Sequence, residues 1–147
     1  MEKISSKGLY ILKDKKIVPY EIDDKLKIIL CGIPGAFTNT CTNKHLPGFA
    51  EKLDKLKLFG VDKVIFVSVN DAYVMDVWNK QHGHSEIDSV SDPLAVFTKH
   101  LKKDVDWGDS FGVRSERYAL LVENGSITKE FEDPFIDGVL YKLWYKV

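Results

Sequence analysis

The sequence predicts an α/β domain in which a mixed central sheet is flanked by helices. Two largely apolar runs, residues 27–33 and 64–69, have the character of strands buried on both faces, and a stretch with helical spacing follows each of them. The dipeptide Asn124-Gly125 lies between two further apolar runs and is a strong signal for an antiparallel hairpin. Parallel strands joined by helices and followed by a hairpin predict a sheet with both kinds of pairing.

Composition and charge are those of one ordinary globular domain. The 147 residues are 44% apolar and 29% charged, with 21 basic and 22 acidic side chains and a net charge of -1. A chain of this size buries roughly 70% of its unfolded surface, so it needs neither disulfides nor a metal to hold a core. The near-neutral charge gives no electrostatic reason to expect nucleic acid or an anionic membrane as a partner. We therefore predict a single domain over residues 1–147.

The sequence also predicts a cytoplasmic location. No apolar run approaches the roughly 20 residues that span a bilayer, and residues 1–7 lack the hydrophobic core of a signal peptide. The only two cysteines are Cys31 and Cys41, whereas a secreted domain that depends on disulfides usually has more. A reducing compartment is therefore expected.

Strands are expected at both ends of the chain as well as in its centre. A polar turn between two short apolar runs near the N-terminus indicates a hairpin, and the run at 27–33 is expected to be the central strand. The glycine-containing stretch before residue 118 gives no regular pattern. Besides the two buried runs, the expected strands are residues 8–12, 16–22, 87–90, 118–122 and 126–131.

The first expected helix begins near Cys41 and ends near Gly60. Thr38, Asn39 and Thr40 are good N-cap types, and Pro47 is expected to kink the helix near its first turns. Its apolar positions follow helical spacing: Leu46, Phe49, Ala50, Leu53 and Leu56.

Three more helices are expected further along the chain. Asn70-Asp71 caps a helix over 72–82, and Asp92-Pro93 opens one that continues to Leu101. A last helix over 135–145 places four side chains on one face, namely Val139, Leu140, Leu143 and Trp144. Together these elements favour a thioredoxin-like fold. A flavodoxin-like doubly wound sheet is the second choice, because an all-parallel sheet would need a crossover where the Asn124-Gly125 hairpin stands.

Cys41 is the candidate nucleophile. It lies in the first turn of a helix that follows a buried strand, where unpaired N–H groups and the helix dipole favour a thiolate. Full ionisation would raise the thiolate fraction at pH 7 only by about 30-fold, so a fast reaction also needs donors that stabilise the transition state. The Thr38 hydroxyl and a guanidinium could supply them, each contributing about 3 kcal/mol.

The residues around Cys41 resemble the peroxiredoxins. Pro34, Thr38 and Cys41 match the active-site motif of that family, and residues 32–38 with 45–49 are similar to the peroxiredoxin-5 subfamily. Residues 68–72 with Trp78, and residues 117–125, resemble later blocks of the same subfamily in the same order. The resemblance covers about residues 28–125. It implies a thioredoxin-like fold and a thiol peroxidase that reduces hydrogen peroxide and alkyl hydroperoxides through a sulfenic acid at Cys41.

The resemblance also implies a role for each matching residue. Pro34 would shield the thiolate, Thr38 would hydrogen-bond thiolate and peroxide, and Arg117 would bind both. Arg114 competes with Arg117 for this role, but Arg117 is preferred because it directly precedes the apolar strand. Residues expected to line the substrate site or to support the reacting groups are Gly35, Thr40 and His45.

The absence of a cysteine after Cys41 predicts how the cycle closes. Many relatives in the subfamily carry a resolving cysteine in the C-terminal third, and residues 42–147 contain none. Cys31 lies in a buried strand and is interpreted as a small apolar core residue. We therefore expect a one-cysteine cycle in which an external thiol, such as glutathione, glutaredoxin or thioredoxin, resolves the sulfenic acid. The resemblance further implies a homodimer that forms near the active site.

Other functions fit the residues less well. Cys41 and His45 could be half of a metal site, but no second pair accompanies them, so neither a metal nor a cofactor is expected. A disulfide oxidoreductase would have Cys-x-x-Cys, and Thr38 occupies the position where the first cysteine would stand. The remaining alternative is a thioredoxin-fold redox sensor or binding module without efficient peroxidase turnover.

Overall fold

The computed structural model describes residues 3–145. Its strands are β1 (Tyr10–Lys13), β2 (Lys16–Pro19), β3 (Lys27–Gly32), β4 (Lys63–Ser68), β5 (Ile87–Ser91), β6 (Asp104–Asp106), β7 (Val113–Ser115), β8 (Tyr118–Glu123) and β9 (Ser126–Glu130). Its helices are η1 (Cys41–His45), α1 (Leu46–Glu51), α2 (Leu53–Leu58), α3 (Ala72–His82), α4 (Val96–His100) and α5 (Ile136–Tyr145). None of the described helices is long and apolar enough to cross a membrane.

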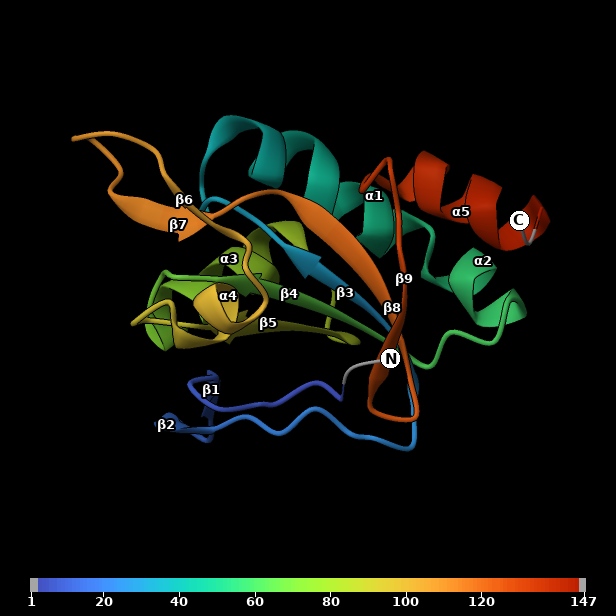
Figure 1. Cartoon of the computed structure of the whole chain (residues 1–147), viewed down its shortest axis with the longest axis horizontal. Coiled ribbons are helices and arrows are strands. Elements are labelled where there is room, and N and C mark those ends of the chain that lie inside the picture. Colours follow the sequence, from blue (N-terminus) through green and yellow to red (C-terminus); the bar gives the residue numbers. More distant parts are fainter. Residues whose placement is uncertain (1–2, 146–147) are drawn as a thin grey trace.

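A seven-stranded mixed sheet forms the centre of the molecule (Figure 1). Its strand order is β2-β1-β5-β4-β3-β8-β9. β3, β4 and β5 are parallel to one another, whereas β8 is antiparallel to β3 and to β9. The expected mixed sheet flanked by helices, with the run at 27–33 near its centre, is confirmed.

Alternating side chains of the central strands divide the core into two clusters. In β3, Ile29 and Cys31 pack on the face covered by α1, α2, α3 and α5, whereas Ile28 and Leu30 pack on the face covered by α4. This alternation follows from the two-residue period of a strand, and both sets are buried because helices or loops cover both faces. Cys31 therefore lies on the same side of the sheet as Cys41.

Both expected hairpins form, and each closes through a two-residue turn. Asp14 and Lys15 have φ of 51° and 65°, and Asn124 and Gly125 have φ of 53° and 76°. Positive φ at both central residues identifies a type I′ turn, whose twist matches that of the flanking strands. The second hairpin carries Arg117 just before β8, so this turn helps to align the strand that begins beside the candidate site.

The segment that begins at Cys41 differs from the single kinked helix that was expected. A short π-helix, η1, precedes α1, and a break at Lys52 separates α1 from α2. Pro47 lies in the first turn of α1, where its missing N–H costs nothing, and the chain accommodates its ring by widening the preceding turn. Gly60, with φ of 82°, ends α2 as expected, and the Val61 N–H donates to Leu56 O at 3.1 Å. The predicted hydroxyl cap is absent, because the N-cap residue Thr40 makes no side-chain cap bond.

Two expectations for the middle of the chain were wrong. α4 begins at Val96 rather than at Pro93, because Ala95 is left-handed and the buried Asp92 carboxylate accepts from Phe97 N and Thr98 N at 3.1 and 2.8 Å. The stretch that gave no pattern contains β6 and β7, which pair as a separate two-stranded sheet projecting from the body (Figure 1).

The last helix forms where expected, but one side chain points the other way. Ile136, Val139 and Leu143 of α5 are buried, whereas Trp144 is 69% exposed. Trp144 lies one residue after Leu143, about 100° further around the helix, so it cannot share the buried stripe centred on Val139 and Leu143.

Candidate active site

Strand pairing brings together residues that are far apart in the sequence. β3 ends at Gly32, and its antiparallel neighbour β8 begins at Tyr118, which is the register partner of Gly32. The chain leaving β3 turns through Pro34 and reaches Cys41, the first residue of η1. Arg117, one residue before β8, therefore lies at the same end of the sheet as Cys41.

The central contact of the site joins a thiol and a guanidinium. Arg117 Nη2 donates to Cys41 Sγ at 3.0 Å. The Cys41 side chain is fully buried, at 0% exposure, so water screens this contact little. The donor is cationic, so this contact is a charge-assisted hydrogen bond, which is stronger than a bond between neutral groups.

His45 holds the same guanidinium from its other side. Arg117 Nη1 lies 2.8 Å from His45 Nδ1, and His45 Nε2 lies 2.9 Å from Pro134 O. Because arginine can only donate and a carbonyl can only accept, Nδ1 accepts and the proton is on Nε2. Burial, and then the charge of Arg117, lowers the pKa of His45 to about 3. The imidazole is therefore neutral at physiological pH.

A segment next to the last helix covers this pair. The Phe135 ring lies 4.9 Å from the His45 ring and 5.4 Å from the Arg117 guanidinium carbon, and Lys44 Nζ lies 4.3 Å above the Phe135 ring. Sequence reasoning missed Pro134 and Phe135, since neither belongs to a motif and both reach the site through tertiary packing. The structure thus connects the start of α5 to the surroundings of Cys41.

The turn before Cys41 makes its own hydrogen bonds. Thr38 Oγ1 donates to Gly35 O at 2.6 Å, and the Thr42 N–H donates to Thr38 O at 3.0 Å. Phe37 has a left-handed φ of 64°, which reverses the chain between Pro34 and η1. The Thr38 hydroxyl is thus oriented by the turn, and its expected contact with thiolate and peroxide stays a prediction.

Asn70 attaches this turn to the neighbouring strand. Asn70 Oδ1 accepts from Ala36 N at 2.8 Å and from Ser68 Oγ at 2.6 Å. The sequence analysis gave Asn70 only a capping role, although its position just beyond β4 could have revealed this contact. In parallel sheets, functional groups gather beyond the carboxyl ends of adjacent strands, here β3 and β4.

The two candidate arginines have different partners. Arg114 Nη1 donates to Pro34 O at 3.1 Å, and its Nε donates to Phe111 O at 3.2 Å. A Cβ built on Gly35 would lie 2.3 Å from Arg114 Nη1, so a side chain there would displace the guanidinium. Arg114 therefore ties the β6–β7 region to the turn, whereas Arg117 contacts the sulfur.

A shallow pocket of about 240 Å³ opens beside the buried thiol. Its apolar lining includes Trp107 and Phe111, which are 44% and 45% exposed, and its polar lining includes Thr40. The lining residues are Pro34, Thr38, Asn39, Thr40, Trp107, Phe111 and Arg117. The expected site residues Pro34, Thr38, Thr40 and Arg117 thus share one opening, and Gly35 lies behind it as a buried turn residue.

Cys31 has no such surroundings. It lies near the end of β3, is fully buried, and forms no disulfide with Cys41. Burial raises the pKa of the Cys31 thiol strongly, and the more distant charge of Arg117 opposes this shift only in part. Among residues 3–145 there is no group of three or more histidine, cysteine or acidic side chains arranged to hold a metal ion.

Comparison with known proteins identifies the family. A family model described as Redoxin matches residues 12–142. Peroxiredoxin-2B of Arabidopsis thaliana is 45% identical over 104 residues, which are 69% of this chain and 64% of that protein. The reduced Prx3 of Vibrio vulnificus in complex with H2O2 superposes with a TM-score of 0.90 at 34% identity, covering 97% of this chain and 96% of that one. The 1-Cys peroxiredoxin of Plasmodium falciparum gives a TM-score of 0.77 at 31% identity, covering 82% and 77%.

These matches define a redoxin-type domain and confirm the thioredoxin-like fold. More narrowly, the chain belongs to the peroxiredoxin family, as its motif residues led us to expect. The matched region spans 64% of the length of curated relatives such as Peroxiredoxin-2C of Oryza sativa.

Proposed function

We propose that this chain is a thiol peroxidase that reduces hydrogen peroxide and alkyl hydroperoxides at Cys41. The observation that carries the proposal is the 3.0 Å contact between Arg117 Nη2 and the fully buried Cys41 Sγ. Membership of the peroxiredoxin family supports the same activity. A structural thiol would need neither a guanidinium hydrogen bond nor an opening beside it.

The proposed reaction transfers one oxygen atom to the sulfur. The Cys41 thiolate attacks the hydroxyl oxygen of the hydroperoxide, so that an S–O bond forms as the O–O bond breaks. The leaving oxygen takes the hydroperoxide proton and departs as alcohol, or as water when the substrate is hydrogen peroxide. Cys41 is left as a sulfenate, which becomes sulfenic acid on protonation.

Arg117 is proposed to act mainly in the transition state. Negative charge moves from sulfur to the peroxide oxygens, and a guanidinium beside both can follow it with its remaining N–H groups. Neutral His45 accepts one of those N–H groups and fixes the plane of the guanidinium through the link to Pro134. Thr38 is proposed as a second donor to the peroxide, and Pro34 as the shield that keeps water from the sulfur.

The sulfenic acid is proposed to be resolved by an external thiol. Thiol attack on the sulfenic sulfur releases water and gives a mixed disulfide, which a second thiol reduces to Cys41 and an external disulfide. Residues 42–147 contain no cysteine, and burial holds the Cys31 thiol in its unreactive neutral form, since its pKa is raised. Glutathione, glutaredoxin and thioredoxin are the proposed classes of reductant.

We further propose a peroxiredoxin-5-type, one-cysteine subtype, acting as one domain over residues 1–147 in the cytoplasm. A homodimer formed near the active site is part of this proposal, since the exposed side chains of Trp107 and Phe111 offer apolar surface there. Sedimentation that gives only monomer at tens of micromolar would contradict the dimer.

The decisive experiment is stopped-flow oxidation of the reduced chain by hydrogen peroxide and by an organic hydroperoxide. Trp78 is a built-in reporter, because its Nε1 donates to Thr42 Oγ1 at 3.0 Å, next to Cys41. We expect second-order oxidation far faster than that of free cysteine at the same pH, with a sulfenic acid at Cys41 found by trapping. A rate equal to that of free cysteine would favour a sensor or binding module instead. A Cys31–Cys41 disulfide, rather than a mixed disulfide with glutathione, would contradict the one-cysteine cycle.

A further inference from the structure

A second hollow lies at the opposite end of β3 from the active site. It has a volume of about 470 Å³ and is bounded by the end of α2, the start of β3, the β8–β9 hairpin and α5. The lining residues are Lys27, Leu58, Phe59, Leu121, Lys129, Lys142 and Leu143, and we call this hollow the lysine groove. Its volume is within the roughly 300–1,000 Å³ of small-molecule sites. Lys27 opens β3, whereas Cys41 follows the end of that strand, so the two sites are separate.

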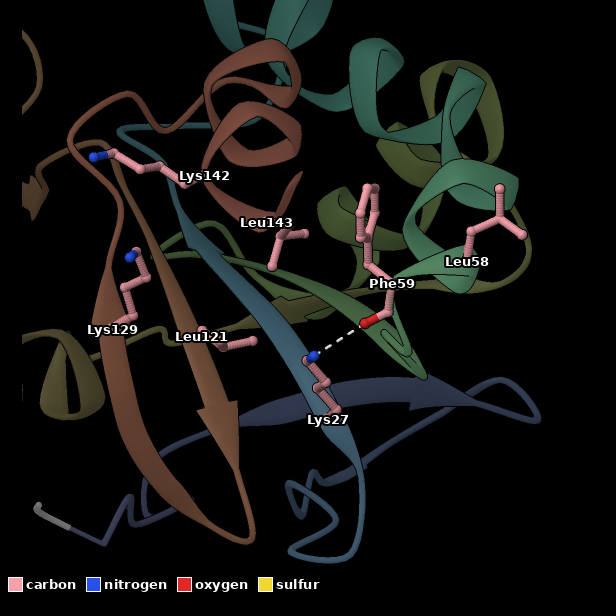
Figure 2. A pocket seen from close by; sticks show the side chains of 7 residues that line it. All are labelled: Lys27, Leu58, Phe59, Leu121, Lys129, Lys142 and Leu143. Carbon is pink, nitrogen blue, oxygen red and sulfur yellow. Dashed lines mark hydrogen bonds between the residues drawn. The ribbon is translucent and has the colours of Figure 1, made fainter. Parts of the chain in front are cut away.

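The lysine groove combines an apolar floor with cationic walls. Leu121 and Leu143 are 8% and 9% exposed and form the floor, which Phe59 and the 85% exposed Leu58 extend on one side. Figure 2 shows Lys129 and Lys142 on the side opposite Leu58 and Phe59. None of the seven lining residues is acidic, and three of them are lysines.

One wall of the groove is held in place by a hydrogen bond. Lys27 Nζ donates to Phe59 O at 3.0 Å, drawn as a dashed line in Figure 2. This bond uses one of the three ammonium donors, so Lys27 keeps two donors for a ligand. It also joins the chain after α2 to β3, so the spacing between the apolar wall and the cation is set before a ligand arrives.

We propose that the lysine groove binds a small amphiphilic carboxylate, with its apolar tail on Leu121, Leu143 and Phe59 and its head among the lysines. An inorganic anion would leave the apolar floor uncovered, and a neutral hydrophobe would gain nothing from the lysine ammonium groups. Only a ligand with both parts uses the whole lining. The medium-chain monocarboxylate octanoate is the simplest probe with this chemistry.

The test is a titration of the reduced, isotope-labelled chain with octanoate, followed by amide NMR shifts. We expect saturable shifts at the amides of Lys27, Leu121 and Leu143, with 1-octanol and inorganic phosphate each binding at least about 5-fold more weakly. Equal binding by either comparison compound, or shifts confined to Thr38 and Arg117, would overturn the proposal.

Two variants with a matched control make the test specific. Lys142→Glu reverses one wall charge and should weaken octanoate binding by about 5-fold or more. Lys99→Glu makes the same change at an exposed site on α4, across the sheet, and should leave binding within about 2-fold. Leu58→Ser, at a largely exposed position, should weaken octanoate but not phosphate. Equal losses in Lys142→Glu and Lys99→Glu would mean unspecific charge attraction and would reject the site, and peroxide oxidation of Cys41 should be unchanged in all three variants.

Discussion

The two cysteines of this protein are equally buried but have different neighbours. Cys31 and Cys41 are both at 0% exposure and belong to the same core cluster on the same face of the sheet. The register partners of Cys31 are Phe66 and Ala119, both apolar, whereas Cys41 receives a hydrogen bond from Arg117. Burial alone therefore does not decide what a thiol can do.

What separates the two thiols is a single positioned cation. Burial without a partner penalises a thiolate, and accordingly the pKa of Cys31 is raised. The same dry surroundings strengthen the attraction between Arg117 and the sulfur of Cys41, because little water screens it. The predictions below test this contrast from the most active thiol to the least active one.

Removing the Cys41 sulfur should have the largest effect. Cys41→Ser is nearly isosteric, and its hydroxyl can still accept from Arg117, so the fold and the melting temperature should change little. Peroxide turnover should fall below a few per cent of the parent value, since a serine hydroxyl cannot take up the peroxide oxygen. The measurement is peroxide consumption with glutathione, glutaredoxin or thioredoxin as reductant, with Cys31→Ser as the matched control. Turnover well above a few per cent would remove Cys41 from the reaction.

Removing the guanidinium tests whether Arg117 stabilises the transition state or only the thiolate. Arg117→Gln should slow Cys41 oxidation by about 10²–10³-fold, or roughly 2–4 kcal/mol, and the loss should persist at a pH where the thiol is fully ionised. Thiolate fraction can account for only about 30-fold, so a larger and pH-independent loss reports contacts with the peroxide.

The control for this experiment is the second arginine. Arg114→Gln removes the bonds to Pro34 O and Phe111 O but leaves the contact on Cys41 in place, so its loss should be smaller. The rate of Cys41 oxidation is measured against pH for both variants. Full recovery of Arg117→Gln at high pH would defeat the transition-state role, and a larger loss in Arg114→Gln would move that role to Arg114.

His45 should matter through the position of Arg117 and should also make the fold sensitive to acid. His45→Phe removes both ring contacts and should slow oxidation by about 10-fold or more, because small misplacements of catalytic groups are costly. His45→Gln, which can still bond Arg117, should recover part of the rate. A His45→Phe variant as fast as the parent would show that Arg117 needs no such support.

The acid sensitivity follows from the pKa of His45, which is about 3 in the folded protein and ordinarily 6.5. Between these values the unfolded chain binds a proton that the folded chain does not, so the free energy of unfolding should fall as pH drops below about 6.5. The expected slope is roughly 1.4 kcal/mol per pH unit, and there is no contribution above that range. Urea unfolding against pH measures this slope. His45→Gln should reduce it, while His100→Gln, at an exposed position, should not.

The different roles of the two cysteines could be predicted from local sequence, but the residues that hold Arg117 and His45 in place could not. The apolar run around Cys31 predicted a core residue. The turn and helix around Cys41 predicted a thiol in the first turn of a helix, close to its unpaired N–H groups. The resemblance pointed to Arg117 and His45, which the structure brings together with Cys41. Pro134 and Phe135 were missed because their contacts depend on how the chain returns to the site.

The errors in the fold have similar physical causes. Strands β6 and β7 have three residues each and lie in a glycine-containing, largely exposed stretch, so hydrophobic alternation gives almost no signal. The start of α4 was misplaced because buried Asp92 bonds to Phe97 N and Thr98 N, while Pro93 suggested an earlier start. The local signal was absent at β6 and β7 and was overridden at α4, whereas the long periodic segment α3 was predicted to the residue.

The smallest effect on activity should come from Cys31. Cys31→Ser should leave peroxide turnover within about 2-fold of the parent, since this sulfur has no part in the proposed cycle, but it should lower the free energy of unfolding by about 1–3 kcal/mol. A serine hydroxyl at this position of β3 faces apolar neighbours, and the strand's own N–H and C=O groups are already used by β4 and β8. Cys31→Ala, which removes the sulfur without adding a polar group, should cost less, and urea midpoints compare the two. If peroxide turnover stops in both variants while the first oxidation of Cys41 survives, Cys31 is the resolving thiol. Both cysteines would then react in the cycle, Cys41 with the peroxide and Cys31 afterwards with the sulfenic acid.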